Sequence, residues 1–457
     1  MPDQVRHDNF MDKFIIDGPT KLQGTVTIGG AKNVALKILI ASLLTDDEII
    51  IRNVPQLRDV RSLIQVLESL GVVVREDGNV LHIKKTNTTD AVTVPFDIGG
   101  SLRTSSLVLG PLLARFGKGN VPNPGGCRLG ARPIDRHIKG LEDMGAVIRY
   151  DSQDGYFHGR AEKLHGTTVS FPKNTHTGTE AIILAAVLAE GETLIENAAE
   201  EIEIDDLITC LKTMGADIKR TKNRIIHIQG VKQLHGVDYT IMPDRNEEIT
   251  FAIAAAITDG NIIVNGSQRQ SLTAFLEVFA RSGGGWEAIS DTQTRYFRKS
   301  DIKPSDIVTQ IHPGFMTDWQ APWAVFMTQA NGVSTIHETV FESRFCYVKE
   351  LQKMGAKIEF YDPEVQNPEQ FYNFNWEDRR EGFHQGIRIS GPTALHNAVL
   401  KADDLRAGAT LVLAALVACG RSYIHGVELI DRGYEHIEER LQKLGAHIER
   451  VTEDVIV

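Results

Sequence analysis

One pattern of apolar and polar positions recurs six times along the chain. Each copy has apolar residues at helical spacing, then a glycine, and then a short apolar run typical of a strand. The copies read LIQVLESLGVVV, HIKGLEDMGAVI, LITCLKTMGADI, FLEVFARSGGGW, YVKELQKMGAKI and IEERLQKLGAHI, with glycines at 71, 145, 215, 283, 355 and 445. Glycine suits the left-handed conformation that often ends a helix. The pattern therefore predicts six repeated units in which a helix ends and a strand follows.

A second helix, apolar nearly all round, precedes each copy. These segments are VALKILIASLL, SSLVLGPLLARFG, EAIILAAVLAEG, FAIAAAITDG, PWAVFMTQANG and TLVLAALVACG. A helix without a polar face must be buried, so the economical packing places helices inside and sheets outside. The expected fold class is α/β, with two domains that each contain three repeats of a βαβαββ type.

One interval between repeats is longer than the others. The excess lies at about 359–386, in an aromatic and acidic stretch with two prolines. Two interpretations remain open for this insertion. Its aromatic side chains form either a lid or partner contact, or a surface loop that packs on itself.

Charge and cysteine usage narrow the class of protein. The formal net charge is -11, which argues against a nucleic-acid or anionic-membrane partner. The four cysteines are far apart, so neither a CxxC site nor a disulfide framework is indicated, and a reduced cytoplasm fits best. No signal peptide, membrane helix, GxxxxGK[ST], HExxH or GxGxxG motif is found. We expect no metal and no cofactor.

Basic residues recur where the predicted helices begin. A cation there opposes the helix dipole unless an anion is also present, so these side chains predict a phosphate-bearing ligand in a cleft between two domains. The set comprises Lys32, Arg103, Arg132, Arg245, Arg344, Arg406 and Arg432. The alternative for each is an ion pair with a neighbouring acid, such as Asp431 for Arg432. For Asp318, Asn33 and Asp135 the alternative is a helix N-cap.

Cys127 stands in the glycine-rich segment PNPGGCRLGARP, which has no apolar periodicity. Arg128 and Arg132 flank it, and a thiol beside guanidinium groups ionises more easily than a free cysteine. We expect a mobile loop that closes over a ligand. Cys210, Cys346 and Cys419 fall within helix patterns and are interpreted as packing residues.

The motifs together resemble those of the enolpyruvyl transferases. The resemblance covers residues 11–457 and rests on GPTKLQGTVTIGGAKN, LGPLLARFG, PGGCRLGARPIDRHI, GETLIENAAEEIEI, ETVFESRF, DLRAGATLVLA and HGVELIDRGYEHIEERLQKLGA. The shikimate-pathway branch carries a serine-lysine motif where this chain has Ala31, Lys32 and Asn33, and it lacks the cysteine loop. The sugar-nucleotide branch is therefore favoured.

The resemblance implies a fold, a reaction and a cellular place. The fold is an inside-out α/β barrel in each half, with domains at 32–241 and at 1–31 plus 242–457 and the active site between them. The reaction moves the enolpyruvyl group of phosphoenolpyruvate to the 3'-hydroxyl of UDP-N-acetylglucosamine and releases phosphate, which begins peptidoglycan synthesis. A cytoplasmic monomer or weak homo-oligomer is implied.

The resemblance also assigns roles to individual residues. Cys127 would act as general acid and form a covalent adduct, and Asp318 would act as general base. Lys32 and Arg406 would join them in catalysis by stabilising charge. The remaining substrate contacts would be Asn33, Arg103, Arg132, Pro133, Asp135, His137, Lys173, Thr175, Arg344, Asp404 and Arg432.

Two segments depart from the family pattern. THTGTE stands where the family has a segment resembling SVGATE, and PDRNEEIT stands in place of PDRIETGT. A paralogue that acts on another uridine nucleotide such as UMP therefore remains an alternative. A more distant alternative is a non-catalytic ring scaffold, which the acidic charge disfavours.

Overall fold

Six sheets share one pattern of strand pairing. The computed structural model describes residues 10–86, 91–125, 130 and 133–454. In five sheets an edge strand runs parallel to its neighbour, and three strands then follow in antiparallel order. The sixth sheet has the antiparallel strands, and a parallel bridge between Thr93 and Asn120 replaces its edge strand. One repeated unit thus builds each sheet.

Three sheets belong to the first half of the molecule, and their orders are β13-β3-β5-β4, β11-β12-β10-β9 and β6-β8-β7. The strands are β3 (Ile49–Arg52), β4 (Val72–Asp77), β5 (Val80–Lys85), β6 (Lys118–Pro122), β7 (Val147–Asp151), β8 (Tyr156–Arg160), β9 (Thr168–Ser170), β10 (Glu192–Glu196), β11 (Asp217–Lys222), β12 (Ile225–Gln229) and β13 (Asp238–Thr240). The helices are α1 (Lys32–Ala41), η1 (Ser42–Leu44), α2 (Arg58–Ser69), α3 (Phe96–Ser101), η2 (Arg103–Val108), α4 (Leu109–Phe116), α5 (Asp135–Asp143), α6 (His176–Ala186) and α7 (Ile202–Thr213).

The other three sheets build the second half, in the orders β21-β22-β1-β23, β15-β16-β14-β2 and β17-β18-β20-β19. The strands are β1 (Phe10–Gly18), β2 (Gln23–Thr27), β14 (Asn261–Asn265), β15 (Gly284–Ser290), β16 (Gln293–Arg298), β17 (Ile307–Val308), β18 (Gly332–His337), β19 (Lys357–Tyr361), β20 (Gly386–Gly391), β21 (Val399–Lys401), β22 (Gly420–His425) and β23 (His447–Asp454). The helices are α8 (Arg245–Ile257), η3 (Arg269–Ser271), α9 (Thr273–Arg281), η4 (Thr317–Trp319), α10 (Gln320–Thr328), α11 (Val348–Lys353), α12 (Pro368–Phe371), η5 (Trp376–Asp378), α13 (Leu405–Val417), α14 (Val427–Ile430) and α15 (Ile437–Lys443).

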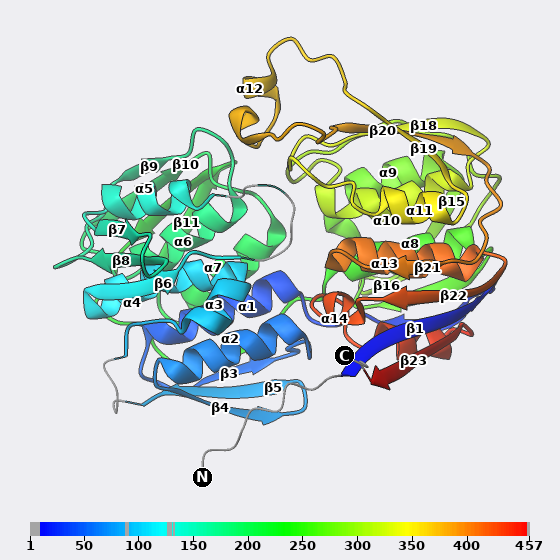
Figure 1. Cartoon of the computed structure of the whole chain (residues 1–457). Helices are drawn as coiled ribbons and strands as arrows, with labels where there is room; N and C mark the ends of the chain where they lie inside the picture. The colour runs from blue at the N-terminus through cyan, green and yellow to red at the C-terminus, as the bar shows by residue number, and fades with distance from the viewer. Residues whose placement is uncertain (1–9, 87–90, 126–129, 131–132, 455–457) are drawn as a thin grey trace.

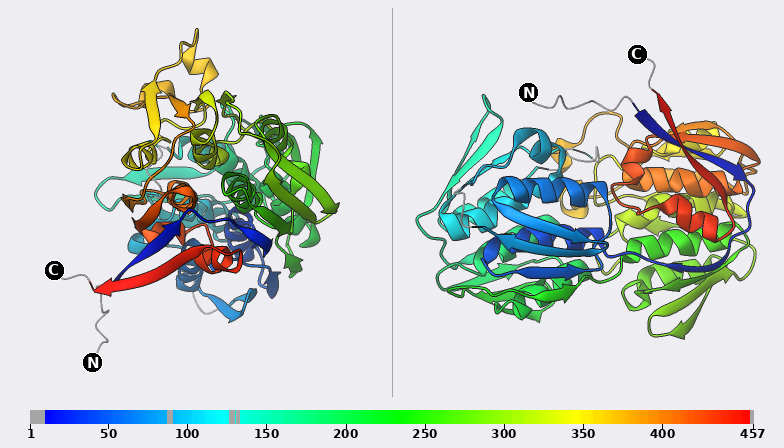
Figure 2. Two further views of the ribbon diagram at one scale, coloured as in Figure 1. Left: turned by 90° about the vertical axis from the view of Figure 1, so that its right-hand side faces the viewer. Right: turned by 90° about the horizontal axis from the view of Figure 1, so that it is seen from below.

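The six repeats and the fold class are confirmed. Helices α2, α5, α7, α9, α11 and α15 each end two residues before the predicted glycine, and a strand follows each of them. All six glycines have a positive φ, between 82° at Gly71 and 103° at Gly215, where a Cβ would be strained. The apolar helices α1, α6, α8, α10 and α13 are buried on nearly every side. Figure 2 shows sheets on the outside of each half and helices within.

The buried apolar side chains form two separate cores. One core draws on residues between Ala31 and Ile241 and defines what we call the first half. The other combines residues from Phe14 to Ile28 with residues from Ile249 to Ile448, and it defines the second half. No helix in the described ranges is both long and apolar enough to cross a bilayer.

The predicted insertion connects two neighbouring antiparallel strands, β19 and β20, which pair Tyr361 with Gly386. We call residues 362–385 the insert. It contains α12 and η5, and α12 stands above the gap between the halves in Figure 1. Tyr372 and Phe374 are buried, and the Tyr372 and Trp376 rings stack with centroids 4.8 Å apart. The aromatic side chains of the insert thus pack on one another, as one interpretation expects, while residues 373–375 also line the cavity between the halves, as the lid interpretation expects.

Candidate active site

A cavity of about 320 Å³ lies between the two halves, with walls supplied by both. Most residues that the sequence singled out face it. The first half supplies Lys32, Asn33, Arg103, Pro133, Asp135, His137 and Thr175, and the second half supplies Asp318, Arg344, Asp404, Arg406 and Arg432. The cations of separate repeats thus meet at one concave surface. Lys32, Arg103 and Arg406 stand in the first turn of a helical segment, as predicted, but Arg344 and Arg432 lie in the connections before α11 and after α14.

Lys32 and Arg432 share one carboxylate across the boundary between the halves. Lys32 Nζ lies 2.7 Å from Asp59 Oδ2, and Arg432 Nε donates to Asp59 Oδ1 at 2.8 Å. Burial raises the pKa of Asp59, but the two cations lower it more, so the net shift is downward. Arg432 does not pair with Asp431, the partner suggested by adjacency, because Asp431 binds Arg450 at 2.7 Å.

Arg406 is the second residue of the apolar helix α13. Asp404 caps this helix and accepts hydrogen bonds of 2.8 Å from the backbone N–H groups of Arg406 and Ala407. The Arg406 guanidinium lies 5.1 Å from the centre of the Tyr434 ring. Its Nη1 is buried and has no hydrogen-bond partner within the described part of the chain. A buried donor without a partner at a cavity wall fits an anionic ligand.

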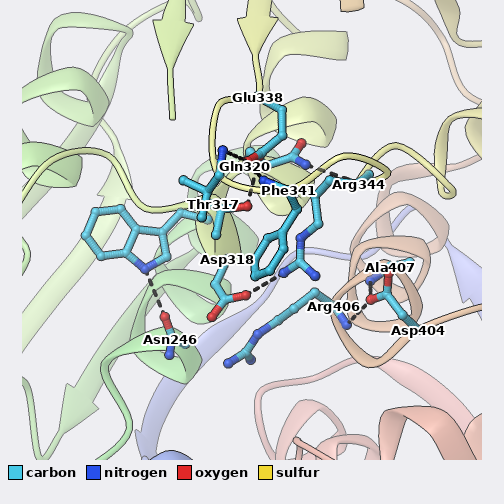
Figure 3. A network of polar contacts seen from close by, with 12 residues as sticks. Asn246, Thr317, Asp318, Gln320, Glu338, Phe341, Arg344, Asp404, Arg406 and Ala407 are labelled. Carbon is cyan, nitrogen blue, oxygen red and sulfur yellow. Dashed lines mark hydrogen bonds and ion pairs between the residues drawn. The ribbon is translucent and has the colours of Figure 1, made fainter. Parts of the chain in front are cut away.

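Asp318 faces two guanidinium groups (Figure 3). Its carboxylate pairs with Arg344, which reaches it from the chain after β18. Burial raises the pKa of Asp318, but Arg344 and Arg406 lower it more, so the net shift is downward and the group is ionised at neutral pH. The helix-cap alternative is wrong here, because no side chain caps η4. The same holds for Asn33 in α1 and Asp135 in α5.

A mostly uncharged wall contains His137, Thr175 and Thr177. His137 Nε2 lies 2.8 Å from Thr177 Oγ1, and Thr175 caps α6 by accepting from Gly178 N. Burial, Arg103 and Arg136 lower the pKa of His137 to about 3. The imidazole is therefore neutral and offers hydrogen bonds without charge.

Several predicted residues lie elsewhere. Lys173 does not line the cavity, because its ammonium donates to Phe374 O at 2.8 Å and pairs with Glu369 of the insert. Arg245 is also absent from the walls. It is fully buried and donates two hydrogen bonds to Glu203. Cys127, Arg128 and Arg132 lie outside the described residues.

The other cysteines differ in environment. Cys210 is buried in α7, and burial raises the pKa of its thiol to about 12. Cys346 donates to Asp404 Oδ2 at 3.1 Å, and burial raises its pKa well above the usual range. The packing interpretation is wrong for Cys419, which is exposed just beyond α13. Helix α13 ends at Val417, two residues before Cys419.

Comparison with known proteins agrees with this geometry. A sequence profile of EPSP synthase (3-phosphoshikimate 1-carboxyvinyltransferase) matches residues 16–441, which is most of the chain. The chain belongs to the EPSP synthase family of enolpyruvyl transferases.

Two similar relatives are both named UDP-N-acetylglucosamine 1-carboxyvinyltransferase. The protein from Acidobacterium capsulatum is 44% identical over 444 residues, which is 96% of each chain. The protein from Lawsonia intracellularis is 43% identical and covers 97% of this chain and 100% of its own. The similarity to these two proteins thus extends over nearly the whole length of the chain.

Solved structures of the family share the fold. The enolpyruvyl transferase NikO from Streptomyces tendae superposes with a TM-score of 0.83 at 23% identity, over 97% of this chain and 99% of that chain. An EPSP synthase from Acinetobacter baumannii gives a TM-score of 0.68 at 19% identity, over 96% and 100%. At these identities the likeness concerns the fold alone.

Some cavity residues of this enolpyruvyl transferase family member escaped the sequence analysis. They are Asp59, Arg136, Asn174, His176, Glu201 and Asn373 to Asn375. Asp59 is an acid in the first turn of α2, which suits any helix dipole, so nothing local indicates its partners. For His176 a signal existed, because it stands inside the THTGTE segment that departs from the family pattern.

His176 makes part of the stability of this family member dependent on pH. Its Nε2 lies 3.0 Å from the buried carboxylate of Glu180, which also faces Lys37 at 3.3 Å. Burial lowers the pKa of His176, but Glu180 and Glu201 raise it more, so the folded value lies above the ordinary 6.5. The protonated pair therefore stabilises the fold fully below pH 6.5, and this contribution disappears as pH rises through the folded pKa.

We expect His176→Gln to lower the Tm most at low pH. The gap to the parent protein should be widest near pH 6 and should narrow toward about pH 9, as the parent imidazole loses its proton. Thermal unfolding followed by circular dichroism across this range measures the gap. A gap that stays constant over the range contradicts a charged His176–Glu180 pair.

Proposed function

We propose that the protein transfers the enolpyruvyl group of phosphoenolpyruvate to the 3'-hydroxyl of UDP-N-acetylglucosamine and releases phosphate. The observation that carries the proposal is the convergence of Lys32, Arg406 and Arg432 with the ionised Asp318 on one interdomain cavity. Relatives at 43% and 44% identity with the name UDP-N-acetylglucosamine 1-carboxyvinyltransferase support this acceptor over UMP. The reaction would begin peptidoglycan synthesis in the cytoplasm.

The cations would bind the small anionic substrate. Phosphoenolpyruvate carries a phosphate and a carboxylate, and Arg406 Nη1 offers a buried donor without a partner in the described ranges. Lys32, Arg103, Arg344 and Arg432 would supply further positive charge around it. Cations that are fixed before the reaction stabilise the charge that develops on the leaving phosphate, an effect of several kcal/mol in enzymes of this kind.

Proton transfers would be divided between Asp318 and Cys127. The Asp318 carboxylate would take the proton of the 3'-hydroxyl while that oxygen bonds to C2 of phosphoenolpyruvate. Cys127 would give a proton to C3, which completes a tetrahedral intermediate. Loss of a proton from C3 and departure of phosphate would restore the double bond in the product. Cys127 would also form a covalent adduct, in which its sulfur bonds to C2 of phosphoenolpyruvate while the C2–C3 double bond breaks and C3 takes up the proton of the thiol.

The acceptor would occupy the less charged wall. Asn33, Pro133, Asp135, His137 and Thr175 would contact the nucleotide, with Arg132 on the uracil side. Asp404 would act mainly by capping α13. We further propose domain boundaries at 32–241 and at 1–31 plus 242–457, which agree with the two cores and their boundary near residue 31.

Release of inorganic phosphate from phosphoenolpyruvate tests the proposal. We expect release with UDP-N-acetylglucosamine and much slower release with UMP or UDP. Release with UMP alone would move the assignment to the other nucleotide branch. No release with any uridine nucleotide would refute the enzyme, while retention of DNA in a mobility shift at low salt would favour the ring scaffold.

Cys127 should be the preferred target of an epoxide of the fosfomycin type. We expect one adduct, mapped to Cys127 by peptide mass spectrometry, with a rate that changes when UDP-N-acetylglucosamine is present. The exposed Cys419 serves as an internal control, because it is accessible but lies away from the cavity. Equal labelling of Cys419 and Cys127 would contradict special reactivity at position 127.

A further inference from the structure

The insert crosses from the second half to the first half and reaches the cavity. It leaves the sheet between β19 and β20, and α12 stands above the gap between the halves in Figure 1. Residues 373–375 of the insert line the same cavity as Asp135 and His137. A connection between antiparallel neighbours needs only a short turn, so its extra length is not needed to build the sheet.

An aromatic cluster gives the insert a fixed shape. The Tyr372 ring stacks on Trp376, and its hydroxyl lies 3.0 Å from His337 Nε2 of β18. The Arg379 guanidinium lies 4.7 Å from the centre of the Trp376 ring. The backbone N–H of Asn373 donates to Thr339 O at 2.8 Å. The aromatic side chains thus form a small core within the insert. The hydrogen bonds to His337 and Thr339 attach this core to the second half.

Polar contacts then fasten this core to the first half. Lys173 donates to Phe374 O and pairs with Glu369, so this lysine anchors the insert. Asn373 Nδ2 donates to Asn174 O at 3.0 Å. Arg136 Nη2 donates to Asn375 Oδ1 at 2.9 Å. Each first-half partner is a sequence neighbour of His137 or Thr175, which line this side of the cavity.

Two asparagines of the insert differ in how many of their side-chain hydrogen-bonding groups already have a partner. Asn375 uses both ends of its amide, because Oδ1 accepts from Arg136 and Nδ2 donates to Asp378 at 3.1 Å. It can therefore orient Arg136, which also lines the cavity. Asn373 uses its Nδ2, while its Oδ1 accepts no hydrogen bond from any described residue. That oxygen remains available to a ligand that donates an N–H or O–H.

We propose that the insert is an acceptor-recognition wall, in which Asn373 accepts a hydrogen bond from the nucleotide sugar and Asn375 positions Arg136 toward an oxygen of the same ligand. The inference rests on the proposed function. It assigns Lys173 to holding this wall rather than to binding a phosphate. Lys32 and Arg432 pair with Asp59, and the Arg406 guanidinium lies against the Tyr434 ring. These partners belong to other parts of the chain than the insert, so changes in the wall should act on the nucleotide and leave phosphoenolpyruvate binding unchanged.

Steady-state kinetics of phosphate release, with each substrate varied in turn, distinguish an effect on nucleotide binding from an effect on phosphoenolpyruvate binding. We expect Asn373→Ala and Asn375→Ala each to raise KM for UDP-N-acetylglucosamine about tenfold, the usual worth of one lost polar contact. KM for phosphoenolpyruvate should stay within about twofold. The matched control is Glu377→Ala, which changes an exposed residue of the same turn and should change neither KM. Thermal unfolding checks that every variant is folded.

A double variant tests whether Asn375 acts through Arg136. If it does, Asn375→Ala combined with Arg136→Ala should raise the nucleotide KM no further than Arg136→Ala alone. A purely structural role for Asn375 predicts effects that multiply. Equal increases in both substrates' KM values, or no change in either, would overturn the inference.

Calorimetric titration with UDP-N-acetylglucosamine keeps the two proposals apart. If the parent protein binds the nucleotide without turnover, the proposed function fails. The inference then stands when Asn373→Ala and Asn375→Ala weaken binding about tenfold and Glu377→Ala does not. If the parent protein does not bind the nucleotide, or if all three variants bind like the parent, the inference fails.

Discussion

Replacing Asp318 by asparagine is expected to lower kcat for phosphate release about a thousandfold, within the range of 10² to 10⁴ for loss of a general base. The amide keeps the shape of the side chain and still accepts a hydrogen bond from Arg344. It cannot take the proton of the 3'-hydroxyl. Both KM values should change much less than kcat, because the cations that bind the substrates stay in place.

The matched control for this variant is Asp403→Asn. Asp403 is exposed and does not line the cavity, although it is the neighbour of Asp404. Its activity should stay within about twofold of the parent, since a surface carboxylate has little influence on a closed site. Activity within tenfold of the parent in Asp318→Asn would remove this residue from the proton transfer and leave only its pairing with Arg344.

Replacing Arg245 by methionine is expected to destabilise the protein by about 3–5 kcal/mol, because it strands a buried charge. Arg245 begins α8 in the second half, and Glu203 lies in the first turn of α7 in the first half. Their two hydrogen bonds measure 2.9 and 2.8 Å, and neither side chain is more than 3% exposed. Urea unfolding followed by tryptophan fluorescence and circular dichroism measures the loss.

Two comparisons isolate the buried charge as the cause. Arg421 makes the same two-pronged contact with Asp17 at 2.8 and 2.9 Å, but both side chains are about half exposed. Arg421→Met should therefore cost less than about 1 kcal/mol. The double variant Arg245→Met with Glu203→Leu should recover most of the loss, because an apolar pair of similar volume needs no compensation. Equal losses in the double and single variants would contradict this account.

The pH dependence of Arg245→Met has a definite sign. In the parent protein burial raises the pKa of Glu203, but Arg245 lowers it more, so the net value lies below 4.5. Its contribution is therefore present above pH 4.5 and is lost only as pH falls through that lower value. In the variant Arg245 no longer opposes burial, and only the weaker effects of His176 and a backbone N–H still lower the pKa of Glu203, so this pKa rises. The stability gap should consequently be larger at pH 7 than at pH 5, where the stranded carboxyl takes up a proton.

Local patterns in the sequence were sufficient to predict the repeats. The glycines at 71, 145, 215, 283, 355 and 445 end helices because a positive φ is a property of a few neighbouring residues. The burial of the apolar helices could also be predicted from the sequence, since a helix without a polar face is stable only in the interior. Basic helix starts predicted Lys32, Arg103 and Arg406 at the cavity, because equivalent positions in repeated units point to one centre.

Pairing between distant residues could not be read in the same way. Arg432 has an acid beside it in the sequence, yet its partner is Asp59 of the other half. Arg245 has the same sequence signature as Arg406, but Glu203 lies close enough to take its guanidinium into the interior. The contacts of Lys173 and Arg136 depend on residues of the insert that lie 201 and 239 positions further along the chain. Such contacts arise from the packing of whole halves, which no local pattern encodes.

The pairing of β1 has a consequence for biosynthesis. Phe14 lies opposite Ile424 in β22 and Arg450 in β23, so a strand made early is completed by strands made last. On the ribosome, residues 31–241 contain a whole core and can pack as they emerge. Strand β1 must meanwhile remain unpaired, with its N–H and C=O edges open, until translation nears the end. The nascent chain therefore exposes a strand with unpaired backbone groups, prone to aggregation, through most of its synthesis. We expect a chaperone to bind first at this strand.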